Sequence, residues 1–129
     1  MKRLCIQIKT LDSSSDFELD RFELISTPTL FVLNYQEPST QALVTVSLDQ
    51  QEVKIVRESE ESQTTIHCAL THKTQAHMRT PFGEQIFDVK TSLIKHQAET
   101  LTVHYELYSG DLLMQRAAVV YQWQERGLN

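Results

Sequence analysis

Residues 87–107, which read FDVKTSLIKHQAETLTVHYEL, contain the pattern that decides the fold. Two series of mostly apolar side chains recur at every second position, and polar residues such as Asp88 and His104 stand between them. The two series are Phe87, Val89, Thr91 and Leu93, then Leu101, Val103, Tyr105 and Leu107. A period of two is typical of half-buried strands, and Gln97-Ala98-Glu99 interrupts it as a turn would. The stretch therefore predicts two antiparallel strands joined by a short connection.

The same alternation continues on both sides of this stretch. It is present in residues 4–8, 43–48, 53–57 and 64–70, with turn-forming residues between these runs. Many short strands separated by turns indicate a sandwich or a barrel, and the lack of helix-forming stretches argues against a parallel β-α-β arrangement. Closing the sheet would remove exposed strand edges. We expect an all-β protein: a single domain over residues 1–129, forming a closed antiparallel barrel of about eight to ten strands.

The last segment, residues 112–126, is ambiguous from its pattern. Leu113, Ala117, Val120 and Trp123 would form a helical stripe, whereas Ala117, Val119, Tyr121 and Trp123 would line one face of a strand. The length of the segment favours a helix, but its β-branched and aromatic content favours a strand. Pattern alone leaves both alternatives open.

Composition narrows the class of protein. The chain has 129 residues, 22% of them charged, and a net charge of −5. A mildly acidic protein is not a typical binder of nucleic acids, which attract a basic face. The N-terminal residues alternate and lack the continuous apolar stretch of a signal peptide or a membrane span. Cys5 and Cys68 follow no metal-binding spacing, so reduced thiols in the cytoplasm are the expected state.

A family resemblance begins at Thr80-Pro81-Phe82-Gly83. From there the stretch TPFGEQIFDVKTSLIKHQAETLTVHYELYSGDLLMQRAAVVYQW resembles the YwiB-like family of small bacterial proteins, whose function is unknown. The resemblance implies a calycin-like, that is lipocalin-like, antiparallel barrel, and it favours a strand at residues 113–123. It implies no catalytic or binding residues. Family members tend to have glycine near Ser26-Thr27-Pro28 and near Leu70-Thr71-His72, so the turn geometry at these two places is open.

The barrel interior is the first candidate site. Small barrels are filled by side chains or hold one small ligand, so a packed core and a ligand-binding lumen both fit the pattern, with packing as the default. The residues expected to line the interior are Phe87, Val89, Leu93, Leu101, Val103, Tyr105, Tyr121 and Trp123.

The second candidate is a local concentration of basic residues. Residues 62–83 contain no aspartate or glutamate. They carry His67, His72, Lys73, His77 and Arg79. The sequence therefore predicts an anion-binding or pH-responsive patch here, although an ordinary polar outer face explains the same residues. The histidine spacing does not suit zinc, because residues at odd separations along a strand point to opposite faces.

These observations leave three hypotheses for function. The leading one is a non-enzymatic binding module for a small apolar or amphipathic ligand, or for a partner protein. The second is an interaction protein that forms a homodimer through an outer face carrying Leu43 and Val56. The third is an enzyme with His77, His96 and an acid at a barrel mouth. No catalytic, metal-binding or cofactor-binding motif is present, so no residue is assigned to catalysis, metal or cofactor.

Overall fold

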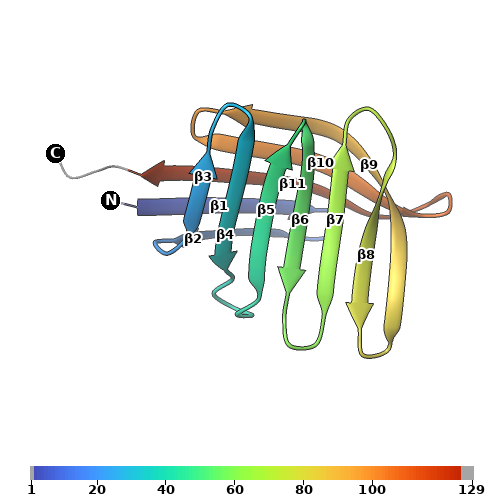
Figure 1. Ribbon diagram of the computed structural model, residues 1–129. Coiled ribbons are helices and arrows are strands. Elements are labelled where there is room, and N and C mark those ends of the chain that lie inside the picture. Colours follow the sequence, from blue (N-terminus) through green and yellow to red (C-terminus); the bar gives the residue numbers. More distant parts are fainter. Residues whose placement is uncertain (1, 126–129) are drawn as a thin grey trace.

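The computed structural model describes residues 2–125, and all regular structure in that range is β-strand (Figure 1). The strands are β1 (Lys2–Thr10), β2 (Ser14–Leu19), β3 (Glu23–Ser26), β4 (Leu30–Gln36), β5 (Leu43–Asp49), β6 (Glu52–Glu58), β7 (Gln63–Ala69), β8 (Thr74–Thr80), β9 (Gly83–Gln97), β10 (Thr100–Ser109) and β11 (Leu112–Glu125). Over these residues there is no helix with the length and apolar character needed to cross a membrane. The predicted all-β antiparallel fold is confirmed, and the ambiguous C-terminal segment is a strand.

The eleven strands form one sheet in the order β2-β1-β11-β10-β9-β8-β7-β6-β5-β4-β3. Neighbours in the sheet are neighbours in the chain, except that β1 pairs with β11, where Leu4 lies opposite Trp123 and Ile6 opposite Tyr121. The two ends of the sheet are therefore β2 and β3, which are consecutive in sequence.

The sheet is an open half-barrel, so the expected closed barrel of eight to ten strands is wrong. β2 and β3 are the two edges, and they do not pair with each other. β2 belongs to the layer at the back of Figure 1, whereas β3 belongs to the front layer, whose strands run steeply across those behind. Edges that cross in this way cannot align their backbone groups into a ladder, and β3 has only four residues to offer.

One long strand connects the two layers. The fifteen-residue β9 pairs with β8 through Gly83–Val89 and with β10 through Asp88–Gln97. In Figure 1 it rises beside β8 and then runs along the upper border of the back layer, above β10. β9 therefore forms the corner at which the sheet folds over on itself.

The core lies between the two layers. Inward residues of β4 and β5, such as Phe31 and Val46, are fully buried, as are Leu4, Leu101 and Val103 in the back layer. Aromatic rings meet across the interior: the centroids of Phe31 and Trp123 are 5.1 Å apart. This part of the half-barrel is filled by side chains, as is usual for small β domains.

A β-bulge interrupts the alternation in β9. Thr91 lies opposite Tyr105 and Leu93 lies opposite His104, so Ser92 is an extra residue without a partner in β10. An extra residue reverses the facing of every residue after it. Ile94 consequently packs against the core, and Leu93, which the alternation had placed inside, does not.

Candidate functional site

Most of the predicted interior residues lie in the core. Val89, Leu101, Val103, Tyr105, Tyr121 and Trp123 are buried. Phe87 is half-buried and packs against them, whereas Leu93 faces away because of the bulge at Ser92. The alternation of β10 and β11 thus located the interior correctly, but it did not show how much of the interior is already filled.

The predicted basic patch is offset by acids from neighbouring strands. His67 Nε2 lies 2.5 Å from Glu52 Oε1, and Lys73 Nζ lies 3.7 Å from Asp88 Oδ2. The Glu84 carboxylate lies close to two basic side chains, with Oε1 3.0 Å from His77 Nδ1 and Oε2 3.6 Å from Arg79 Nε. The hydrogen bond with His77 is the main cause that lowers the pKa of Glu84. Here the outer face carries mixed charge rather than a uniformly basic surface.

These acids could not be found by scanning residues 62–83 alone. Glu52 lies on β6, and Glu84 and Asp88 lie on β9, so all three reach the basic residues only through antiparallel pairing. The fifth residue of the patch, His72, stands in the β7–β8 turn, with Nδ1 3.0 Å from Thr71 Oγ1. It lines one open depression together with His67, Lys73 and His77.

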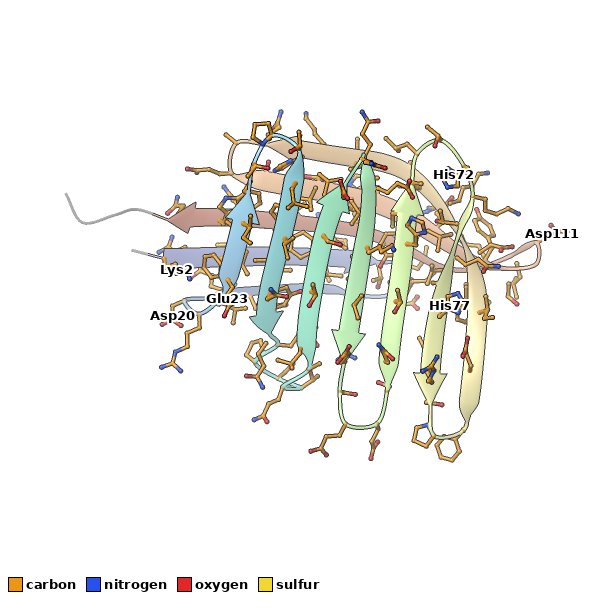
Figure 2. All side chains as sticks on the ribbon, viewed as in Figure 1. Lys2, Asp20, Glu23, His72, His77 and Asp111 are labelled. Carbon is orange, nitrogen blue, oxygen red and sulfur yellow. The ribbon has the colours of Figure 1, made fainter. Side chains whose placement is uncertain are left out.

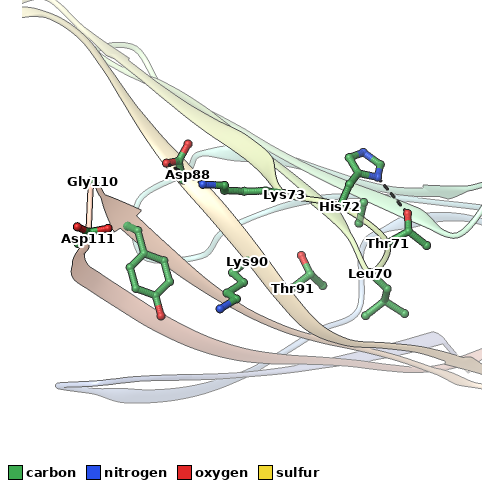
Figure 3. Close-up of a pocket in the computed structure, with 11 residues that line it drawn as sticks. Leu70, Thr71, His72, Lys73, Asp88, Lys90, Thr91, Gly110 and Asp111 are labelled. Carbon is green, nitrogen blue, oxygen red and sulfur yellow. Dashed lines mark hydrogen bonds and ion pairs between the residues drawn. The ribbon is translucent and has the colours of Figure 1, made fainter.

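A pocket of about 470 Å³ opens at the corner where β9 bends (Figure 3). Three segments that are far apart in sequence surround it. They are the β7–β8 turn with the end of β7 (residues 69–73), the middle of β9 (residues 88–91) and the β10–β11 hairpin (residues 108–111). Figure 2 shows His72 and Asp111 at the same end of the molecule, opposite the end that holds Lys2 and Glu23.

The walls of this corner pocket are charged, and one cation is not engaged in an ion pair. Lys73 is paired with Asp88. Lys90 stands opposite Glu106 on β10, but Glu106 already binds Arg116 at 2.8 Å and accepts a hydrogen bond from Tyr108 at 3.1 Å. Among the described side chains, those of residues 2–124, no carboxylate lies within ion-pair distance of the Lys90 ammonium.

The hydrogen bonds to Glu106 shift two titrations. The bond from Arg116, followed by that from Tyr108, lowers the pKa of the Glu106 carboxyl. The hydrogen bond between Tyr108 and Glu106 also raises the pKa of the Tyr108 phenol. The charge of Lys90 makes a smaller contribution to the same lowering, so Glu106 stays ionised, bonded to Arg116 and attracted at longer range by Lys90.

The floor of the pocket touches a polar group of the core. Thr91 lines the pocket, and its Oγ1 is buried beside the Cys68 thiol, with which it forms a hydrogen bond that opposes the effect of burial on the pKa of that thiol. Behind it, the Cys68 thiol has its pKa raised to about 11 by burial. Burial also raises the pKa of the Tyr105 phenol. The Thr91 hydroxyl therefore has a polar neighbour in the Cys68 thiol beneath the pocket.

Sequence reasoning missed most of this pocket. His72 and Lys73 were singled out, but as members of a basic patch, and Lys90, Tyr108 and Asp111 were not singled out at all. From the sequence, Lys90, Tyr108 and Asp111 can be recognised only as residues in or near a turn or on the outer face of a strand. They come together because β9 bends, and no local pattern predicts that bend.

The residues proposed for an enzymatic site do not meet. His77 lies on the outer face of β8 beside Glu84. His96 lies near the end of β9, 3.4 Å from Ser26 Oγ and with its ring 5.4 Å from that of Phe31. Among the described residues, no group of three or more histidine, cysteine, aspartate or glutamate side chains could hold a metal ion.

Comparison with known proteins places the chain in a family. No curated protein matches it. The crystal structure of the ywiB protein from Bacillus subtilis superimposes with a TM-score of 0.66 over 96% of this chain and 90% of that one, at 14% sequence identity, which shows a shared fold. The family model described as "Domain of unknown function (DUF1934)" matches residues 6–119. Since that match covers most of its length, the chain belongs to the DUF1934 family, as the resemblance to YwiB-like proteins implied.

Proposed function

We propose that the protein is a non-enzymatic binding module and that its corner pocket takes a small amphipathic anion. The observation that carries the proposal is the pocket itself, about 470 Å³ and lined by three separate segments, with Lys90 on one wall, which makes no ion pair with a described side chain. Ligand pockets in proteins commonly have volumes of about 300–1,000 Å³ and combine apolar lining with a few polar groups.

The two parts of such a ligand would meet different surfaces. Ala69 and Leu70 offer apolar contact at the end of β7, and the buried Thr91 hydroxyl lies on the floor. Lys90 and Lys73 offer ammonium groups for a carboxylate, sulfonate or phosphate. A charge-assisted hydrogen bond to Lys90 would add affinity without breaking an existing ion pair.

The resemblance to calycins suggested a ligand inside the lumen, and the corner pocket is a better place for it. Between β4 and β11 the interior is occupied by ring contacts, with Phe31 against Trp123 and Tyr35 at 6.5 Å from Tyr121. A ligand there would have to displace packed aromatic side chains, which costs several kcal/mol, on the order of a buried Phe-to-Ala change. The corner pocket requires no such rearrangement.

A titration with anilinonaphthalene sulfonate, followed by its fluorescence, tests this function. The Lys90→Gln variant should bind the probe about tenfold more weakly, because it loses one charge-assisted hydrogen bond. Lys95→Gln is the matched control: it removes the same charge from the same strand, at an exposed residue that does not line the pocket. Equal affinity of the two variants would contradict the proposed site.

The alternative of a homodimer through the outer face gains no support from the structure. Leu43 is 59% exposed, but its partner in β6 is Glu58, and Val56 lies opposite Thr45. Apolar residues separated by polar ones do not form the contiguous patch that marks an interface.

A further inference from the structure

We propose that the outer face of β6, β7 and β8 carries a second site, which binds a chain of linked phosphate groups when its histidines are protonated. An open depression of about 620 Å³ lies on this face. We call it the histidine depression, after its basic lining residues, which are Lys54 of β6, His67 of β7, His77 of β8, and His72 with Lys73 of the β7–β8 turn.

Strand pairing brings these side chains to one face. Lys54 is the direct partner of His67, and Thr65, two residues before His67 on the same strand face, is the direct partner of His77. Direct partners in antiparallel strands have Cβ atoms about 4.5–5.5 Å apart. Three neighbouring strands therefore each present one basic side chain, over a width of roughly 10 Å. His72 lies beyond them in the turn, above His77 in the view of Figure 2.

Around the depression, positive and negative groups balance while the histidines are neutral. Three permanent cations then stand against three carboxylates: Lys54, Lys73, Arg79, Glu52, Glu84 and Asp88. On the side of the corner pocket, Lys90 and Asp111 line the same wall as His72 and add one charge of each sign. Of the three carboxylates only Asp88 lines the depression, and Lys54 makes no ion pair with a side chain in residues 2–124.

Acid shifts this balance towards positive charge. Histidine is the side chain that ordinarily changes its charge between pH 5 and 8, whereas carboxylates are ionised over that range. Protonation of His67, His72 and His77 leaves six cations against the same three carboxylates. The depression then attracts anions, and its affinity for them rises as the pH falls.

The arrangement of the cations suits several linked phosphates better than a single one. Because the cations stand on three strands and a turn, one phosphate reaches only some of them, whereas a linear oligophosphate extends across the strands. The Thr65 hydroxyl and the Gln75 amide offer further donors to phosphate oxygens. The described lining residues include no phenylalanine, tyrosine or tryptophan on which a nucleobase would stack, so the phosphate chain itself is the ligand.

Isothermal titration of the intact protein with sodium tripolyphosphate, at constant ionic strength, tests the site. The expected Kd is below about 1 mM at pH 5.5 and at least about tenfold weaker at pH 7.5. Phosphate groups take up protons near pH 6, so the ligand loses negative charge in acid and cannot itself cause the tighter binding. Orthophosphate should bind at least about tenfold more weakly than tripolyphosphate, and ATP within about threefold of it.

Variants locate the site. At pH 5.5, His77→Gln and Lys54→Gln should each weaken tripolyphosphate binding about tenfold. The matched controls His104→Gln on β10 and Lys9→Gln on β1 should leave it unchanged, because neither residue lines the depression. Lys90→Gln should also leave it unchanged, and His77→Gln and Lys54→Gln should still bind anilinonaphthalene sulfonate, so the two proposed sites stand or fall separately.

Four results would overturn the proposal. They are no binding at pH 5.5, equal affinity at the two pH values, losses in the control variants as large as those in His77→Gln, and binding of ATP much tighter than that of tripolyphosphate. The last result would mean that the nucleoside, rather than the phosphate chain, is recognised.

Discussion

Phe31 on β4 and Trp123 on β11 lie with their ring centroids 5.1 Å apart, and this contact joins the front layer of the half-barrel to the back layer. Phe31 also meets the His96 ring edge-on at 5.4 Å. Because the sheet is open between β2 and β3, no ladder holds the layers together at that side. Side-chain packing of this kind therefore stabilises the folded-over sheet.

Truncating Phe31 should destabilise the fold strongly. Phe31 is 0% exposed, so Phe31→Ala should lower the free energy of unfolding by about 3–5 kcal/mol, measured by urea denaturation. Phe82→Ala is the matched control, because Phe82 is 98% exposed at the β8–β9 turn, and it should change stability by no more than about 0.5 kcal/mol. Similar losses for both variants would contradict the role given to Phe31.

A substitution in the β5–β6 hairpin should raise the stability of the protein. Gln50 and Gln51 have φ angles of 52° and 66°, in the left-handed region that costs residues other than glycine about 1–2 kcal/mol. Asn-Gly is the favoured pair for such a turn. Replacing Gln51 by glycine should therefore raise the free energy of unfolding by about 0.5–1 kcal/mol. Gln7→Gly, in the middle of β1, should lower it; a loss of stability with Gln51→Gly would show that the turn is not strained.

Stability should fall at alkaline pH partly through Cys68. Burial raises the pKa of this thiol from 9.0 to about 11, so the unfolded chain ionises first. The stabilisation is complete below pH 9 and is lost as the pH rises through about 11, an effect of roughly 2–3 kcal/mol. Denaturation at several pH values should show a shallower decline for Cys68→Ala than for the native protein. An identical slope in both proteins would contradict this assignment.

The Arg116–Glu106 pair should control an acidic titration. Arg116 donates to Glu106 at 2.9 Å, and this bond is the main cause of the lowered pKa of the carboxyl. Arg116→Gln should raise the pKa of Glu106 towards its ordinary value, as followed by carboxyl NMR. Arg79→Gln should leave the Glu106 titration unchanged, because Arg79 acts on Glu84. A Glu106 pKa that does not move in Arg116→Gln would refute the pairing.

Local pattern was enough to predict the strands and their inward faces. Leu101, Val103 and Tyr105 alternate in sequence and are buried in the structure, because a regular strand carries its period of two directly into space. The same reasoning failed at Leu93, since one extra residue at Ser92 reverses the phase and has no signature in the sequence.

The closure of the sheet and the composition of the corner pocket depend on contacts between distant strands. β2 and β3 read as two more strands, and nothing in their sequence shows that they lie in different layers. The alternation places Lys90 and Tyr108 on the outer faces of their strands. The bend of β9 brings them around one pocket with His72. Glu52 and Glu84 offset the basic residues of 62–83 only through strand pairing.

Mapping the bound probe on the protein tests the proposed function most directly. Backbone amide resonances would be recorded while anilinonaphthalene sulfonate is added. The predicted result is that the largest shifts gather in residues 69–73, 88–91 and 108–111, which surround the corner pocket. Shifts centred on the core residues of β4 and β11, or spread over the outer face without a centre, would contradict a binding site at this corner.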